Sequence, residues 1–340
     1  MSAGITAEPG LVWSSEGVSP SVRLNTGALM PALAFGTGAM PRMAAGKRRL
    51  RSSRRTLLDR INMSLALGYR HIDTAEVYAG FDVVGNVVRR WSTQDHPIFL
   101  TSKVDPTRTP GRRGMLCNTD GTGCRAAMMR AANDTVRRLG VVPSLLLLHR
   151  PPQRKSNDGS QCIRLRESWR GLEEAHNAGL AHAIGLSNCC GGLLRCLARM
   201  SLRYRPAVLQ YMHHIGMGQD PFGYRTWGRR QWNATYMAYS VLGGAEGDFE
   251  RIARSPIVQR VAVAHSTGGA NVALSWVAQQ GLPLVILSSS SEHLREDVSI
   301  FSTPRWGALS RAEMEALSSL REPRGRPSHW GDCEDVAVER

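Results

Sequence analysis

The sequence lacks any apolar stretch long enough to cross a membrane. No run reaches the roughly 18 uncharged residues that a transmembrane helix needs. The first residues also lack the basic segment followed by an apolar one that marks a secretory leader. We therefore expect a cytosolic (cytoplasmic) protein with no membrane partner. With 340 residues, of which 42% are apolar, the chain can bury one large α/β domain or two of ordinary size.

Cysteine is sparse and scattered. The seven cysteines form no Cys-x-x-Cys pair and no cysteine–histidine set with the spacing of a zinc site. We therefore expect no structural metal. An odd number of dispersed cysteines is typical of a reducing compartment, which agrees with a cytosolic protein.

A complete glycine-rich phosphate loop is also missing. After the apolar run 33–36, the chain continues with Gly36 and Gly38, but the third glycine is absent and Pro41 interrupts the segment. An open, doubly wound sheet needs that loop after its first strand, so the segment disfavours such a fold without excluding it.

Basic residues are in excess, because 43 lysines and arginines face 28 acidic residues, a formal charge of +15. Part of this charge is concentrated in the run Lys47–Arg55. The run has no interleaved aromatic residue on which a base could stack, so we interpret it as a solvated loop and helix start and expect no specific nucleic-acid partner. A patch that binds polyanions is the alternative.

Eight short apolar runs alternate with longer amphipathic stretches, several of which end at a glycine typical of a helix C-cap. The runs are 33–36, 70–73, 98–102, 144–149, 183–187, 207–210, 235–240 and 284–288. Strand followed by helix, repeated eight times, predicts an α/β protein folded as a single (β/α)8 TIM barrel.

The remaining segments complete the predicted domain organisation. Residues 21–33 contain two apolar stretches around Asn25-Thr26-Gly27, which predicts a short N-terminal β-hairpin. We expect a flexible arm over 1–20, the barrel over 21–320 and a disordered tail over 321–340.

Polar residues stand at or just beyond the carboxyl ends of the predicted strands. They are Asp73, Lys103, His149, Ser187, Asn188, Gln210, Tyr239, Ser240 and Ser288. A parallel barrel opens its active site at that end, so we expect these side chains to converge on one pocket. The irregular segments 105–123 and 214–233 fall on the same side and are candidates for setting substrate choice.

Four of the polar residues could reduce a carbonyl. A tyrosine with a pKa of ~10 is a poor proton donor unless its phenolate is stabilised. A neighbouring lysine ammonium does that, and a carboxylate keeps the lysine charged. Asp73, Tyr78 and Lys103 offer this set, and His149 could bind the substrate oxygen. Each residue alone has a simpler structural explanation, such as an N-cap for Asp73, so the prediction depends on their joint placement.

Longer segments resemble one protein family, the aldo-keto reductases. GYRHIDTAEVY (68–78) resembles the family's second-strand signature, IFLTSK (98–103) the strand with its lysine, and LGVVPSLLLLHRP (139–151) the segment with its histidine. The similarity continues in order through 171–188, 205–210, 237–243 and 271–281, and covers about residues 22 to 320.

The resemblance implies an NAD(P)H-dependent reductase of small aldehydes or ketones that acts as a monomer. It implies that Asp73, Tyr78, Lys103 and His149 are catalytic, with Tyr78 as proton donor, and that Tyr239 stacks on the nicotinamide. The cofactor, NADPH with NADH possible, would be bound by Gly36, Thr37, Asp73, Ser187, Asn188, Gln210, Tyr239, Ser240, Leu242, Gly243, Ser288, Ser290 and His293.

The sequence departs from the family pattern at the positions that usually bind the 2′-phosphate of NADPH. The lysine's place falls on Ser288 or Ser290, and the arginine's place on His293. These side chains lack the charge-assisted, bidentate contact of arginine. Gly80-Phe81 also replaces the usual Asn-Glu after the tyrosine. A catalytically weak or silent barrel that binds nicotinamide cofactor, as a sensor or a subunit, is therefore the alternative function.

Overall fold

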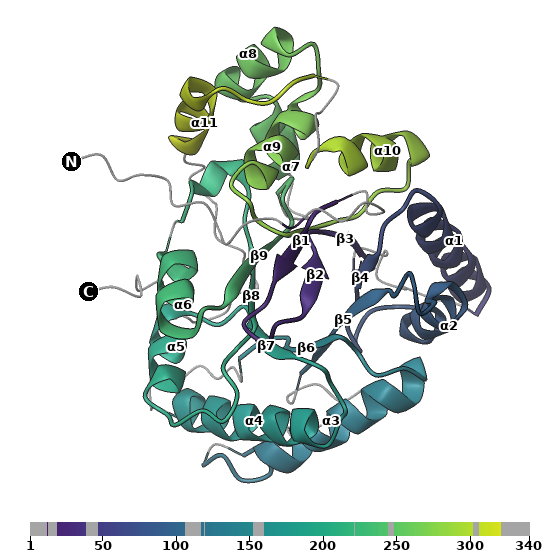
Figure 1. Cartoon of the computed structure of the whole chain (residues 1–340), viewed down its shortest axis with the longest axis vertical. Coiled ribbons are helices and arrows are strands. Elements are labelled where there is room, and N and C mark those ends of the chain that lie inside the picture. The colour runs from purple at the N-terminus through teal and green to yellow at the C-terminus, as the bar shows by residue number, and fades with distance from the viewer. Residues whose placement is uncertain are drawn as a thin grey trace.

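Eight parallel strands close into a barrel, as the alternating pattern predicts (Figure 1). Each predicted apolar run overlaps one strand, and β5 and β8 extend two residues beyond their runs. The strands are β3 (Leu33–Gly36), β4 (His71–Asp73), β5 (Phe99–Val104), β6 (Leu145–Leu148), β7 (Ile184–Ser187), β8 (Val208–Met212), β9 (Thr235–Tyr239) and β10 (Leu284–Ile286). The last strand pairs with the first, with Leu284 opposite Leu33, which excludes an open sheet.

The computed structural model describes residues 12, 19–38, 47–105, 117, 118, 120–151, 160–220, 222–243, 248–301 and 306–320. The side chains of 47–55 and 248–250 are outside this description. The predicted tail 321–340, most of the predicted arm 1–20 and much of the loop 105–123 also lie outside the described residues. The basic run Lys47–Arg55 forms the first half of a helix, and its suggested binding role stays a prediction.

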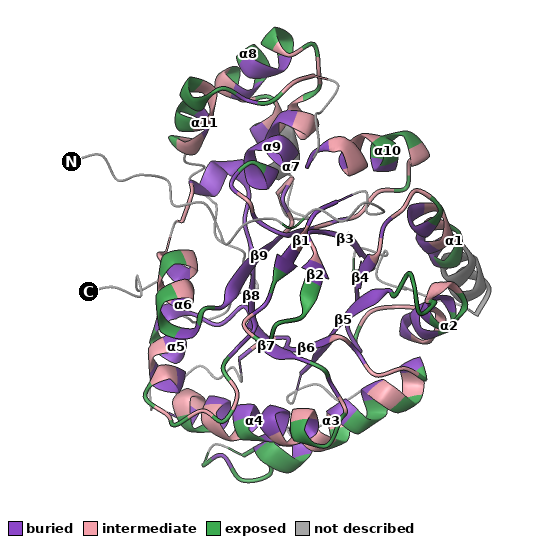
Figure 2. Ribbon diagram, in the orientation of Figure 1, coloured by how far each residue is buried: buried purple, intermediate pink, exposed green. Residues whose placement is uncertain are grey.

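Helices surround the barrel and bury one face each, whereas the strands are almost wholly buried (Figure 2). They are α1 (Lys47–Ala66), α2 (Phe81–Trp91), α3 (Cys124–Leu139), α4 (Ser160–Asn177), α5 (Gly191–Ala198), α6 (Tyr224–Trp232), α7 (Asp248–Ala253), α8 (Pro256–Ala264), α9 (Gly269–Ala278), α10 (Ser291–Ser299) and α11 (Arg311–Ser318), with a 3-10 turn η1 (Ile215–Met217). Glycine ends α3 as predicted, because Gly140 has a φ of 67° that a side chain would disfavour. None of the described helices is long and apolar enough to span a membrane.

The predicted hairpin is present and covers one end of the barrel. β1 (Ser21–Arg23) and β2 (Leu29–Pro31) pair antiparallel around a turn in which Gly27 has a φ of 88°. The Asn25 amide donates to the backbone oxygens of Pro206 and Trp232, at 2.9 and 3.0 Å. Because these residues precede β8 and β9, the hairpin closes the amino-terminal end of the strands and leaves the opposite end open.

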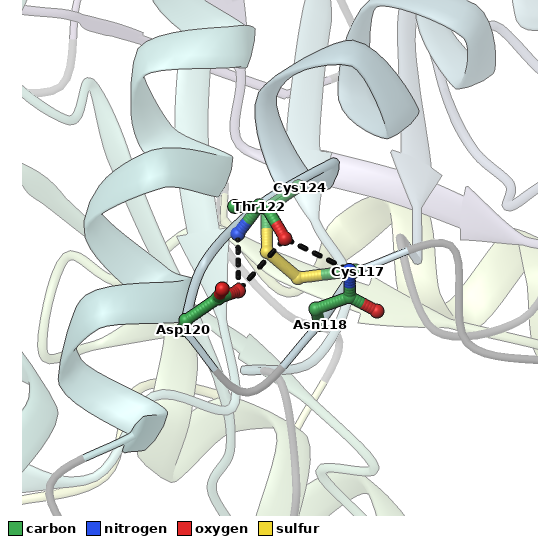
Figure 3. Close-up of a disulfide and its surroundings, with 5 residues drawn as sticks. All are labelled: Cys117, Asn118, Asp120, Thr122 and Cys124. Carbon is green, nitrogen blue, oxygen red and sulfur yellow. Dashed lines mark hydrogen bonds between the residues drawn. A yellow bond between two sulfur atoms is a disulfide. The ribbon is translucent and has the colours of Figure 1, made fainter.

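Several cysteines form disulfides, whereas the sequence-based expectation of a reducing compartment implies free thiols. Cys117 is bonded to Cys124, and Cys162 on α4 is bonded to Cys196 on α5. The first bond closes a short loop in which Thr122 donates from its backbone and its hydroxyl to Asp120, at 2.9 and 2.8 Å (Figure 3). The sequence could not show these pairs, because bonding depends on Cα separations of 4.2 and 5.8 Å that only the fold creates.

Candidate active site

A cavity of about 940 Å³ opens at the carboxyl end of the strands. It brings together all four predicted catalytic residues and most of the predicted cofactor contacts, which come from eight strands spread over more than 200 positions. Those lining it are Gly36, Asp73, Tyr78, Lys103, His149, Ser187, Asn188, Gln210, Tyr239, Ser240, Leu242, Gly243, Ser288 and His293. Two predicted contacts, Thr37 and Ser290, are not among the lining residues.

A buried ion pair lies at the floor of the cavity. The Lys103 ammonium bonds the Asp73 carboxylate and donates to the Thr74 backbone oxygen at 3.0 Å. Asp73 is also held by the Gln210 amide, which donates to its second oxygen at 2.8 Å. Burial by itself lowers the pKa of Lys103, but the Asp73 carboxylate and the Tyr78 hydroxyl outweigh it and raise that pKa above its usual value. The lysine is therefore charged at neutral pH.

Tyr78 lies between this ion pair and His149. The Lys103 ammonium is 5.2 Å from the centre of the tyrosine ring, and the rings of Tyr78 and His149 meet edge to face with centres 5.6 Å apart. Burial raises the pKa of Tyr78, and the Lys103 ammonium opposes that rise. The phenol is therefore protonated at neutral pH, and the charge that would stabilise its conjugate base is beside it.

Glycine makes room for the phenol. A side chain at Gly38 would place its Cβ 2.8 Å from the Cζ atom and 3.1 Å from the hydroxyl oxygen of Tyr78. Two residues after the tyrosine in the sequence, Gly80 has a φ of 79° and precedes α2. Glycine at position 80, where this sequence departs from the family pattern, therefore adopts a left-handed backbone conformation that most other residues disfavour.

Amide side chains at the ends of β7 and β8 are fixed by bonds within the protein. Asn188, with a φ of 60°, donates to the His149 backbone oxygen at 2.9 Å and accepts from the Tyr239 hydroxyl at 2.6 Å. These bonds hold the tyrosine ring and the histidine backbone on opposite sides of one amide. Thr37 has a similar structural role, because its hydroxyl bonds to Thr74 at 2.9 Å.

The part of the cavity beside β10 and α10 is acidic. Glu296 and Asp297 line it together with Ser288 and His293, and among the described residues of these two elements no lysine or arginine does. Burial, followed by the neighbouring Glu296, raises the pKa of Asp297 to about 7. The Ser290 hydroxyl accepts from the His293 backbone at 3.3 Å and so caps α10.

Sequence reasoning missed several residues that line the cavity. Besides the two carboxylates, they are Gly38, Val77, Arg150, Val241, Ser266, Thr267, Gly268, Ala270, Asn271, Leu274, Val285, Ile286 and Leu287. Ser266-Thr267-Gly268 directly before α9 is a stretch of small polar residues at a helix start, a signal that could have indicated a binding loop. No such signal marked Arg150, which stands out only through its place in the cavity.

The chain is similar over most of its length to known oxidoreductases. It is 29% identical to morphine 6-dehydrogenase of Pseudomonas putida over 313 residues, which cover 89% of this chain and 92% of that protein. It is 27% identical to NADPH-dependent codeinone reductase 1-2 of Papaver somniferum, covering 91% and 92% of the two chains.

Solved structures share the fold. An aldo-keto reductase of Bombyx mori in complex with NADP superposes with a TM-score of 0.72 at 22% identity, covering 94% of this chain and 99% of that one. A sequence model described as "Aldo/keto reductase family" matches residues 32–322. The chain therefore belongs to the aldo-keto reductase family, whose members are NAD(P)H-dependent oxidoreductases.

Proposed function

We propose that this protein reduces small aldehydes or ketones, with Tyr78 as the proton donor. One observation carries the proposal: a buried Lys103–Asp73 ion pair stands beside the Tyr78 phenol, at the wall of a cavity that can admit a cofactor and a small molecule. A carbonyl oxygen bound near the phenol would gain negative charge during reduction and would need both a proton and a hydrogen-bond donor.

The four polar residues divide the work. The nicotinamide, when bound, supplies hydride to the carbonyl carbon. The Tyr78 hydroxyl gives its proton to the carbonyl oxygen, and the Lys103 ammonium stabilises the phenolate that remains. Asp73 keeps that ammonium charged and in place. His149, edge-on to the tyrosine ring, orients the oxygen by a hydrogen bond.

The residues at the cavity wall fit a nicotinamide cofactor. Amides of Asn188 and Gln210 match the donor and acceptor edges of a carboxamide, and Tyr239 offers an aromatic face beside them. The glycines Gly36 and Gly243 leave backbone accessible at the wall. We infer that NADPH is used, as it is by the codeinone reductase. We infer that NADH is also accepted, because no described lysine or arginine of β10 or α10 lines the cavity.

The decisive variant is Tyr78→Phe, which removes the hydroxyl and keeps the ring against Gly38 and His149. We expect turnover of a reactive aromatic aldehyde to fall by about 100-fold or more, the range typical of a lost general acid. Cofactor binding, followed by quenching of tryptophan fluorescence with NADPH and NADH separately, should stay within about twofold, since this change removes no cofactor contact that we propose.

The matched control is Tyr239→Phe, which also removes one hydroxyl from the cavity wall. That hydroxyl donates to Asn188 at 2.6 Å, and the variant keeps the aromatic face proposed to lie against the nicotinamide. Its turnover should fall far less than that of the Tyr78 variant. Tyr78→Phe with parental turnover would refute the proton-donor role. Cofactor binding by the parent without turnover of any carbonyl would instead favour the silent sensor or subunit.

Two further predictions concern the whole protein. We propose that it acts as a monomer, because the cavity is lined within one chain by every group that the mechanism uses. The sequence-based placement in the cytosol stays a prediction that the Cys117–Cys124 and Cys162–Cys196 disulfides oppose, since cytosolic thiols are normally kept reduced.

A further inference from the structure

Arg150 is a cation in the wall of the cavity, next to His149, that the mechanism does not use. It follows His149 directly at the end of β6, lines the cavity and is half-buried. Its backbone position is firm, because the preceding His149 donates its N–H to Val104 at 2.8 Å and accepts from the Asn188 amide at 2.9 Å. The backbone that bears the Arg150 side chain is thus held in place next to the catalytic His149.

The other charged side chains of the cavity do not neutralise Arg150. Lys103 and Asp73 neutralise each other at the floor. Glu296 and Asp297 belong to α10, which follows β10, and β10 lies four places from β6 in the ring of eight strands. The two carboxylates are therefore on the opposite side of the barrel mouth from Arg150.

Within the part of the chain that the structure describes, no carboxylate forms an ion pair with Arg150 and no hydrogen bond engages its guanidinium. A half-buried guanidinium without a counterion is costly, because it gives up hydration without gaining a partner. Its charge is close enough to Tyr78 to oppose, after Lys103, the rise in the pKa of the phenol that burial causes. A ligand that brings its own negative charge would remove this cost.

We propose that Arg150 selects carbonyl substrates that carry an anionic group, a carboxylate or a phosphate, a few bonds from the carbonyl. The inference rests on the proposed reductase function and names its substrate class. The guanidinium presents a planar fork of donors that binds two oxygens of such a group at once. With the carbonyl oxygen held by Tyr78 and His149, and the anion held by Arg150, a substrate would be fixed at two points.

The test compares two nearly isosteric aldehydes, 4-carboxybenzaldehyde and its neutral amide 4-formylbenzamide, with the parent and with Arg150→Met. We expect Arg150→Met to lower kcat/KM for the carboxylate by about 10- to 100-fold, as for a lost hydrogen-bonded ion pair, mainly through KM. The amide should change by less than about threefold. Comparing the two substrates within each protein cancels their intrinsic difference in reactivity. A third aldehyde, 4-formylphenyl phosphate, distinguishes phosphate from carboxylate as the preferred anion.

A binding measurement tests the same contact without turnover. The NADP⁺-loaded protein, whose oxidised cofactor has no hydride to give to an aldehyde, is titrated calorimetrically with 4-carboxybenzaldehyde and with 4-formylbenzamide. The parent should bind the carboxylate more tightly by about tenfold, and Arg150→Met should lose that difference. Arg150→Lys, which keeps the charge but not the fork, should retain part of it.

Equal losses for the charged and the neutral aldehyde would overturn the inference and make Arg150 a structural residue. A loss of cofactor binding in Arg150→Met would overturn it by assigning the guanidinium to the cofactor. Absence of turnover with every aldehyde would refute the proposed function, and the calorimetric comparison would still decide whether Arg150 binds an anion.

Discussion

The buried ammonium of Lys103 decides what the Tyr78 phenol can do. Without it, burial would leave the phenol with a raised pKa and no means to stabilise its conjugate base. The Asp73 carboxylate compensates the ammonium for the hydration that it loses on burial. Gln210 in turn donates a hydrogen bond to the second oxygen of Asp73. Lys103, Asp73 and Gln210 are each polar, almost fully buried and partnered, as a preorganised site requires.

Cofactor choice also depends on single residues. His293 lines the cavity on an exposed part of α10, where the sequence analysis placed the family's phosphate-binding arginine. We expect His293→Arg to tighten NADPH binding by about tenfold, because a guanidinium makes bidentate, charge-assisted bonds to a phosphate, and to change NADH binding by less than about threefold. Fluorescence titrations with both cofactors measure the ratio.

The control for that variant is Glu292→Gln, one residue away and also exposed. It raises the net charge by the same single unit, so any long-range effect of charge should appear in both variants. A ratio of affinities that shifts equally in both would mean that position 293 does not contact the 2′-phosphate.

At the scale of elements, the Cys117–Cys124 and Cys162–Cys196 disulfides connect segments that lie outside the strands. The Cys162–Cys196 bond ties α4 to α5, and the Cys117–Cys124 bond ties a short loop to the first turn of α3 (Figure 3). Both stand outside the strands, on the segments that connect them. Their main physical effect is to restrict the unfolded chain, so the stabilisation that each disulfide contributes depends on the length of chain that it closes.

The dependence on loop length predicts which disulfide contributes more to the free energy of unfolding. Cysteine separations of 34 and 7 residues predict losses in the free energy of unfolding of about 4 kcal/mol for Cys162→Ala with Cys196→Ala, and about 2 kcal/mol for Cys117→Ala with Cys124→Ala. Urea unfolding of both double variants and of the parent, each without reductant, measures the difference. Equal losses, or a larger loss from the shorter loop, would contradict the chain-entropy explanation.

On the scale of the whole molecule, the formal charge of +15 should act at long range. A nicotinamide cofactor is an anion, and a positive field speeds the encounter of such a ligand with its site. We expect the association rate of NADPH to fall several-fold, roughly three- to tenfold, when salt rises from about 0.05 to about 0.5 M. Stopped-flow fluorescence measures the rate.

NADH is the matched ligand for this prediction, because it lacks the 2′-phosphate and should show a weaker dependence on salt. The KM of a neutral aldehyde such as benzaldehyde should hardly change over the same range. Equal salt effects on both cofactors and the aldehyde would point to a change in the protein rather than to electrostatic attraction.

The sequence by itself determined the architecture. Eight apolar runs of strand length, each followed by an amphipathic stretch, predict a parallel barrel, because hydrophobic periodicity reflects local burial. The pairing of β10 with β3 then excludes the open sheet that the sequence left as an alternative. Since the carboxyl ends of parallel strands meet at one rim, the same pattern placed Asp73, Lys103 and His149 in one cavity before their contacts were known.

Only the tertiary structure decided the features that depend on approach between distant segments. The disulfide partners, the Gln210 bond to Asp73 and the contact of Gly38 with Tyr78 each join residues whose separation in sequence carries no signal. Arg150 is the clearest case: any arginine after a strand can be solvated, and the closed ring of strands alone sets it opposite the carboxylates of α10 with no counterion among the described residues. Local periodicity determines elements, whereas the partner of a charge is determined by packing.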